Sequence, residues 1–257
     1  MLSWPTHVLE QNSKLPKNGT YYVVARNGTF IRKDMPLIEA LVPTTISSLE
    51  IAVPYAGSKM PKIPTALLIR SLLFFRVVYK RHRAEAIVLL HYSERQKKYM
   101  LWCPNQKVAG LRIASYDPHE RFKDFQLVGT IHSHASVSAG HSSTDHNDEK
   151  NFDGLHITLG DVEQLHAFSL SASLMVNGHR FVKEPSELIR GVSMLGGQKY
   201  DFILPKGKDC RHIQFPRNWL KKVKGESRAD QNHRLGRNRL LPDRQTAPVS
   251  GLFGERR

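Results

Sequence analysis

The sequence predicts an α+β protein with a mostly antiparallel or mixed β-sheet. Two observations lead to this fold class. One long apolar helix pattern comes early in the chain, and strand-length apolar runs follow it with few helices between them. With 257 residues, the chain is long enough for one main domain with additions. We expect a β-rich N-terminal extension at residues 1–60, the main domain at 61–195 and a basic C-terminal tail at 196–257.

The N-terminal extension begins with a hairpin pattern. The stretch "YYVVARNGTFIRK" (21–33) consists of two β-branched, aromatic-rich runs around Asn27-Gly28. Asn-Gly is a strong hairpin signal because both positions of the favoured two-residue turn need a positive φ. The stretch "YAGSKMPKIP" (55–64) contains one glycine and two prolines, which predicts a linker into the main domain.

A helix is predicted over residues 64–82. Its segment "TALLIRSLLFFRVVY" (65–79) is short for a membrane span and carries Arg70 and Arg76, so we expect a buried helix and no membrane association. The basic end "YKRHR" suits the negative end of a helix. Strands are expected after it, with one short helix at 186–195. The strand-like runs are 85–92, 98–104, 125–134, 155–160, 166–176 and 179–184.

The charge and the cysteine content limit the expected cellular environment and binding partners of the protein. The net charge is +15, and the tail from Lys206 onward carries 14 basic against 5 acidic residues. Its apolar residues are sparse, so we expect it to be mobile or only partly ordered. Such a tail favours nucleic acid or another polyanion as a partner. The two cysteines, Cys103 and Cys210, form no CxxC motif, and the N-terminus lacks a signal-peptide pattern; both features fit the cytoplasm.

The stretch "HSHASVSAGHSSTD" (132–145) follows the apolar run "QLVGTI" and holds three histidines, five serines and one aspartate. His132 and His134 are two residues apart at the end of a predicted strand, so their side chains share one face and reach one point in space. Asp145 can return to that point through a loop of small residues. Imidazole and carboxylate are common zinc ligands, and three protein ligands leave the fourth position open, as in catalytic zinc sites.

The spacing of this stretch is specific. His132-Ser133-His134, seven residues, Ser142, two residues and Asp145 resembles the signature of the JAB/MPN (JAMM, Mov34/PAD-1-like) zinc metalloproteases, prokaryotic branch. The resemblance spans roughly residues 64–190. It implies the family's cytidine-deaminase-like fold, a curved mixed or antiparallel β-sheet flanked by helices, with zinc at one edge. Val88 departs from the family pattern, which commonly has glycine there.

The resemblance also implies roles for individual residues. One Zn²⁺ per chain would be held by His132, His134 and Asp145. Glu85, upstream at the start of an apolar strand, would be the general base that activates the zinc-bound water. Ser142 would hydrogen-bond the developing oxyanion. The plain alternatives are that Glu85 is a solvent-exposed charge at a strand end and that Ser142 caps a loop.

Several nearby residues have competing interpretations. Glu94 and Glu120 are the other candidates for the general base, although neither opens an apolar strand. His141 and His146 are expected to be exposed loop histidines. His156 lies inside an apolar run. We expect it to be a core residue or a residue that supports the metal ligands without binding the metal itself. Asp148 and Glu149 are expected in the first turn of a short helix, where acidic side chains suit the helix dipole.

The function expected from this site is that of a zinc peptidase or isopeptidase, deubiquitinase-like, which hydrolyses an amide or isopeptide bond in a protein or peptide substrate. Substrates with a ubiquitin-like tail are one class that the resemblance implies. Two alternatives stay open. The first is a non-catalytic MPN-type scaffold, and the second is nucleic-acid association through the basic tail, with the main domain as a structural module.

Overall fold

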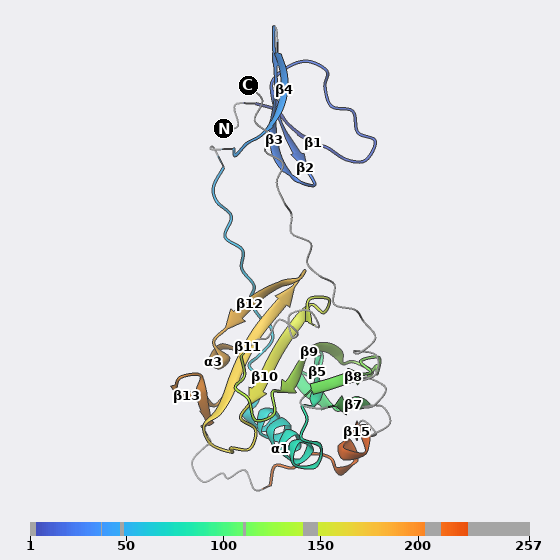
Figure 1. The fold of residues 1–257 in the computed structure, drawn as a ribbon, viewed down its shortest axis with the longest axis vertical. Coiled ribbons are helices and arrows are strands. Elements are labelled where there is room, and N and C mark those ends of the chain that lie inside the picture. The colour runs from blue at the N-terminus through green and yellow to red at the C-terminus, as the bar shows by residue number, and fades with distance from the viewer. Residues whose placement is uncertain are drawn as a thin grey trace, which may run out of the picture. The chain divides into compact units, whose positions relative to one another are not determined.

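The computed structural model describes residues 4–36, 38–46, 49–109, 112–140, 149–203 and 212–225. The chain divides into two compact units, Met1–Tyr55 and Ala56–Arg257. The division lies five residues before the boundary expected from the linker pattern. Each unit has its own β-sheet (Figure 1).

The N-terminal unit is a four-stranded sheet in the order β1-β2-β3-β4. The predicted hairpin is present, but its turn is Arg26-Asn27, because Ala25 pairs with Gly28. The expectation that Asn27 and Gly28 occupy the turn is therefore wrong by one residue. Gly28 supplies the positive φ, 138°, at the first position after the turn, where the absence of a Cβ removes the steric cost. The strands are β1 Thr6–Val8, β2 Tyr21–Ala25, β3 Gly28–Met35 and β4 Ile38–Pro43.

The second unit is an α+β fold around a mixed, curved sheet (Figure 1). The strand order is β13-β14-β11-β10-β9-β5-β6, and β12 also pairs with β11. Within this sheet β9 and β10 are parallel, and the other neighbours are antiparallel. The strands are β5 Ile87–Ser93, β6 Lys98–Trp102, β9 Gln126–Ser133, β10 Gly154–Gly160, β11 Phe168–Val176, β12 His179–Lys183, β13 Val192–Gly196 and β14 Lys199–Phe202.

Helix α1 (Thr65–His82) covers one face of this sheet, as the apolar pattern predicted. It ends at Arg83, whose φ of 50° breaks the helix and whose N–H donates to the carbonyl of Tyr79. Its apolar residues pack on alternate residues of the central strands, such as Val88 of β5 and Ile131 of β9. In the part of the chain that the structure describes, no helix combines the length and the apolar character that crossing a bilayer requires.

The opposite face of the central strands is polar although it is buried. Because successive strand residues alternate between faces, the neighbours of the core residues point away from α1. On β9, β10 and β11 these neighbours are hydrophilic, and the cross-strand register places them side by side. The row consists of Thr130, His132, His156, Thr158 and Ser173, all buried. A buried polar face needs partners for its side chains, and these partners form the candidate site described below.

The C-terminal part of the chain requires a correction. The expected helix at 186–195 is only the short α3 (Pro185–Leu188), and the chain beyond 196 does not begin as a tail: β14 extends the large sheet, and β13 pairs with it. Residues 212–225 also contribute, because the 3-10 helix η1 (Arg217–Lys222) leads into β15 (Val223–Gly225). Apolar anchors such as Trp219 explain why: a few large side chains can order an otherwise basic segment.

Strand β15 belongs to a small sheet that was not expected from the sequence. It pairs in parallel with β7 (Gln106–Ala109), and β7 pairs with β8 (Arg112–Tyr116). The apolar content of these strands is too low to distinguish them from loops by pattern alone. Residues 204–211 and 226–257, which hold most of the expected basic tail, lie outside the described residues.

We predict that Trp219→Ala destabilises the second unit by about 3–5 kcal/mol, the usual cost of removing a buried aromatic side chain. Trp219 is 3% exposed, and its ring lies 5.3 Å from that of Phe74 on α1. Urea denaturation followed by fluorescence or circular dichroism measures the loss. Lys221→Ala, on the exposed side of the same 3-10 helix, is the control and should change stability little. A Trp219→Ala variant as stable as the control would mean that this segment is not part of the core.

Candidate metal centre

The end of β9 brings two of the predicted ligands together. His132 is the penultimate residue of the strand, His134 follows it, and their ring centroids are 5.2 Å apart. Both side chains are nearly buried, with 6% and 9% of their surface exposed. The backbone of this region is held by the neighbouring strand, since the N–H of His134 donates to the carbonyl of Leu159. The alternation of strand residues thus places both imidazoles on one face of the sheet edge.

The ring of His134 has a defined tautomer. Its Nδ1 lies 3.1 Å from the carbonyl oxygen of Ser138. A carbonyl only accepts hydrogen bonds, so Nδ1 carries the proton and Nε2 is the unprotonated nitrogen of the neutral ring. This is the arrangement of a metal-binding histidine, whose second nitrogen donates to a carbonyl or carboxylate.

His132 is placed by its strand neighbours. In the sheet it lies between Ile87 of β5 and Thr158 of β10. The hydroxyl of Thr158 is 3.4 Å from Nε2 of the ring, and a carboxylate oxygen of Glu149 is 3.7 Å from Nδ1. A donor hydroxyl on one side and an acceptor carboxylate on the other favour the tautomer with the proton on Nδ1.

Ser133 ties the two histidines to the start of β5. Its hydroxyl accepts a hydrogen bond from the N–H of Ala86 at 3.0 Å, and its own N–H donates to the carbonyl of Ala86 at 2.9 Å. Ser133 is fully buried. Because Glu85 directly precedes Ala86, this pair of bonds fixes the backbone of Glu85 beside the histidine pair.

The other side of β5 is held by a side chain. The amide of Gln106 accepts from the N–H of Ile87 at 3.0 Å and donates to its carbonyl at 2.9 Å. It thereby replaces the neighbouring strand at this position, since both backbone groups of Ile87 find partners. The beginning of β5 is therefore clamped from both sides.

Glu85 is half-buried and lies two residues before β5, so it precedes the strand rather than opening it. By register it continues the row of alternate β5 residues that share the face of His132. Glu94 lies beyond the other end of β5, a strand about 23 Å long, and pairs there with Lys97. Glu120 precedes the N-terminal end of β9, whereas His132 and His134 lie at its C-terminal end. Of these three glutamates, only Glu85 is at the histidine end of the sheet.

The remaining predicted residues lie outside the described part of the chain. Ser142 and Asp145, together with His141, His146 and Asp148, belong to residues 141–148. The described residues therefore include two of the three expected zinc ligands, and within them no group of three potential metal ligands occurs. The donor set that is described fits zinc: Nε2 is the unprotonated nitrogen of His134, and the contacts of His132 favour the same tautomer.

Glu149 is the residue whose place the sequence did not predict. It was expected as a helix-dipole acid, but it is 7% exposed and lies against the polar face of the sheet. One oxygen of its carboxylate is 2.7 Å from a guanidinium nitrogen of Arg180 on β12, and the other lies near His132 and His156. The sequence signal for this contact is weak, because Arg180 follows a turn and resembles an ordinary exposed strand residue.

His156 is a buried neighbour of the centre, as expected. Its Nε2 is 3.0 Å from the carbonyl of Phe152, and its Nδ1 is 3.0 Å from the hydroxyl of Thr130. Burial lowers the pKa of His156 below its ordinary value, against the raising effect of Glu149. Both ring nitrogens are thus engaged in hydrogen bonds within the fold.

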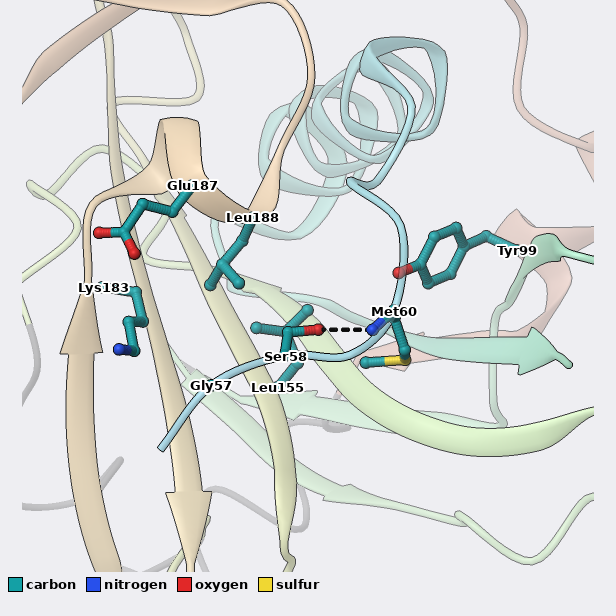
Figure 2. A pocket seen from close by; sticks show the side chains of 8 residues that line it. All are labelled: Gly57, Ser58, Met60, Tyr99, Leu155, Lys183, Glu187 and Leu188. Atoms are coloured by element: carbon teal, nitrogen blue, oxygen red, sulfur yellow. Dashed lines mark hydrogen bonds between the residues drawn. The ribbon is translucent and has the colours of Figure 1, made fainter. Parts of the chain in front are cut away.

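A pocket lies elsewhere in the second unit (Figure 2). The segment with Gly57 and Ser58 passes over it, and Leu155 and Leu188 contribute apolar side chains. Its other lining residues are Met60, Tyr99, Lys183 and Glu187. Glu85, His132 and His134 do not line it, so the pocket is separate from the histidine pair.

Comparison with known proteins adds no assignment: no protein-family model matches the sequence, and no curated protein matches it. The functional interpretation therefore depends on the motif residues and their geometry.

We predict that Ser133→Ala lowers the free energy of unfolding by about 1–3 kcal/mol, because the buried N–H of Ala86 loses its acceptor. Chemical denaturation measures this loss. Ser93→Ala is the matched control: Ser93 is equally buried in the same sheet, but it lies at the far end of β5, where it accepts a hydrogen bond from the N–H of Gln96. Zinc content should fall in Ser133→Ala and stay unchanged in the control. Equal zinc content in both variants would show that the hydrogen bonds between Ser133 and Ala86 do not position the histidines.

Proposed function

We propose that this protein is a zinc-dependent peptidase or isopeptidase of the JAMM type, which hydrolyses an amide or isopeptide bond in a protein or peptide substrate. Ubiquitin-like proteins are one substrate class. The observation that carries the proposal is the pair of buried imidazoles, whose ring centroids are 5.2 Å apart at the end of β9, with the Nδ1 of His134 bonded to the carbonyl of Ser138. The motif spacing supplies the third ligand, Asp145.

His132, His134 and Asp145 would hold one Zn²⁺ per chain. When bound, the ion supplies Lewis acidity, which lowers the pKa of a bound water to about 7 and makes hydrolysis feasible at neutral pH. Three protein ligands suit this role because they leave a position for water and substrate.

Glu85 would act as the general base and acid of the reaction. Its carboxylate would accept a proton from the attacking water and deliver it to the leaving amine. The double hydrogen bond between Ala86 and Ser133 supports this role, because it fixes the backbone next to Glu85 relative to the histidines. Ser142 would donate a hydrogen bond to the carbonyl oxygen of the scissile bond as negative charge develops on it.

We predict that Glu85→Gln keeps about one zinc per chain and loses about 100- to 10,000-fold in catalytic rate, the usual contribution of a general base. Glutamine has the shape of glutamate but cannot accept the proton. The zinc content is measured by metal analysis of the pure protein. The catalytic rate is measured on a substrate that is first identified by screening ubiquitin-like and peptide-linked amides.

The control for this variant is Glu94→Gln, at the other end of β5, which should retain full activity. Loss of zinc from Glu85→Gln would show that Glu85 is a ligand and that the coordination set is different. Full activity of Glu85→Gln would exclude it as the base.

A second function, nucleic-acid association, is favoured by a separate observation. Cations of the folded chain gather at the small sheet: Lys224 of β15 is the direct cross-strand partner of Lys107 of β7. The ammonium of Lys222, which follows Lys221 and directly precedes β15, lies 3.3 Å from the ring centroid of Trp102. Like charges placed opposite each other destabilise a sheet, so their presence suits a surface that meets an anion.

This basic surface leads directly into the basic C-terminal part of the chain. Residues 212–225 contain Arg217, Lys221, Lys222 and Lys224 and no acidic residue. The phosphate backbone of nucleic acid is the anion that such a surface binds without sequence preference. The scaffold alternative, a domain without catalysis, would retain this association and lack hydrolysis.

We predict that the double variant Lys107→Gln/Lys224→Gln weakens binding to single-stranded DNA and makes it less sensitive to salt, because fewer counterions are released. Fluorescence anisotropy over about 50–200 mM salt measures both effects. Lys33→Gln/Lys59→Gln removes two exposed lysines from other parts of the chain and is the control. Identical affinity and salt dependence of the two double variants would exclude the small sheet as a nucleic-acid surface.

A further inference from the structure

Glu149 is a buried carboxylate whose role neither the motif nor the proposed reaction assigns. Its side chain is 9% exposed, and the side chain of its ion-pair partner Arg180 is 11% exposed. A second guanidinium nitrogen of Arg180 donates to the hydroxyl of Ser173 at 2.8 Å. Arg180 is therefore fixed on the polar face of the sheet, and it fixes Glu149 in turn.

The burial of this carboxylate requires more than one partner. Within the described residues, neither oxygen of Glu149 accepts a hydrogen bond of good geometry, although one oxygen is 2.7 Å from Arg180. A buried charge without sufficient partners is strongly destabilising, so N–H groups near the second oxygen are needed to compensate it. The two ring nitrogens that face this oxygen are Nδ1 of His132 at 3.7 Å and Nδ1 of His156 at 3.5 Å.

Only one of these two nitrogens can donate when both rings are neutral. His156 must carry its proton on Nε2, because that nitrogen faces the carbonyl of Phe152. Its Nδ1 is then a lone pair that accepts from Thr130 and offers nothing to Glu149. The N–H that faces Glu149 is therefore that of His132, and its Nε2 is left as a lone pair on the side of Thr158.

We propose that Glu149, held by Arg180, is a positioning residue that fixes the orientation and tautomer of the metal ligand His132. Carboxylates behind metal-binding histidines set the ring orientation and raise the basicity of the ligating nitrogen.

This inference rests on the proposed function, and zinc affinity tests the two separately. The affinity is measured by competition with a chromophoric zinc chelator, and the absorption spectrum of the Co²⁺-substituted protein reports on the ligand environment. Glu149→Gln should bind zinc about 10- to 100-fold more weakly than the wild type, the usual effect of removing a partner behind a ligand. Arg180→Lys keeps the positive charge but loses the second nitrogen that holds Ser173, so its zinc affinity should lie between those of Glu149→Gln and the wild type.

Two further variants separate positioning from general stability. Asp161→Asn breaks another partly buried ion pair of the same unit, at 2.6 Å from Lys199, and should leave zinc affinity unchanged. The double variant Glu149→Leu/Arg180→Met removes both charges together, which folded proteins tolerate far better than an unpaired buried charge. This double variant should fold and should bind zinc more weakly than the wild type. If Glu149→Gln does not fold, the zinc affinity of the double variant tests the inference instead.

The outcomes are distinct. Folded Glu149 variants with wild-type zinc affinity and an unchanged Co²⁺ spectrum would overturn the inference and leave the proposed function intact. An equal loss of affinity in Asp161→Asn would also overturn it, because the effect would then follow stability. A wild-type protein that binds no zinc would overturn both the inference and the proposed function.

Discussion

The reciprocal pair of hydrogen bonds between Ser133 and Ala86 is the contact on which the candidate centre depends. It joins the end of β9 to the start of β5, two strands that are far apart in sequence, at 3.0 and 2.9 Å. The last residue pair of the two strands is Ile87 with His132, and Glu85 and His134 lie just beyond it, so the bonds between Ser133 and Ala86 hold together the two segments that carry them. Short-range order of this kind matters because catalytic groups act only when their geometry is fixed before substrate arrives.

The sheet supports this centre by having two different faces. Toward α1 its alternate residues are apolar and fully buried, as at Val88 and Ile131. On the other face, buried Thr130, His156 and Ser173 form hydrogen bonds with partners that the strand register or the following segments bring close. Buried polar groups stabilise a fold only when they are satisfied, so this face is costly unless it serves a purpose. Holding the proposed metal ligand His132 in one tautomer would be such a purpose.

The sequence was sufficient for the parts that depend on periodicity. The apolar run at 65–79 became α1, and the spacing of His132 and His134 placed both rings together, since strand alternation is a local property. It was insufficient where structure depends on contacts between distant residues. The clamp by Gln106, the burial of Glu149 against Arg180 and the ordering of residues 212–225 by Trp219 each need a partner more than fifteen residues away. No local pattern of charge or hydropathy identifies such partners.

The central claim is that His132 and His134 are ligands of one zinc ion in a site completed by a carboxylate. The most direct test is X-ray absorption spectroscopy at the zinc edge of the full-length protein, purified with zinc available and without chelators. The account predicts about one zinc per chain in a nitrogen and oxygen environment, with the scattering signature of two imidazoles and no sulfur ligand. A protein that carries no zinc, or a zinc ion bound through sulfur, would contradict it.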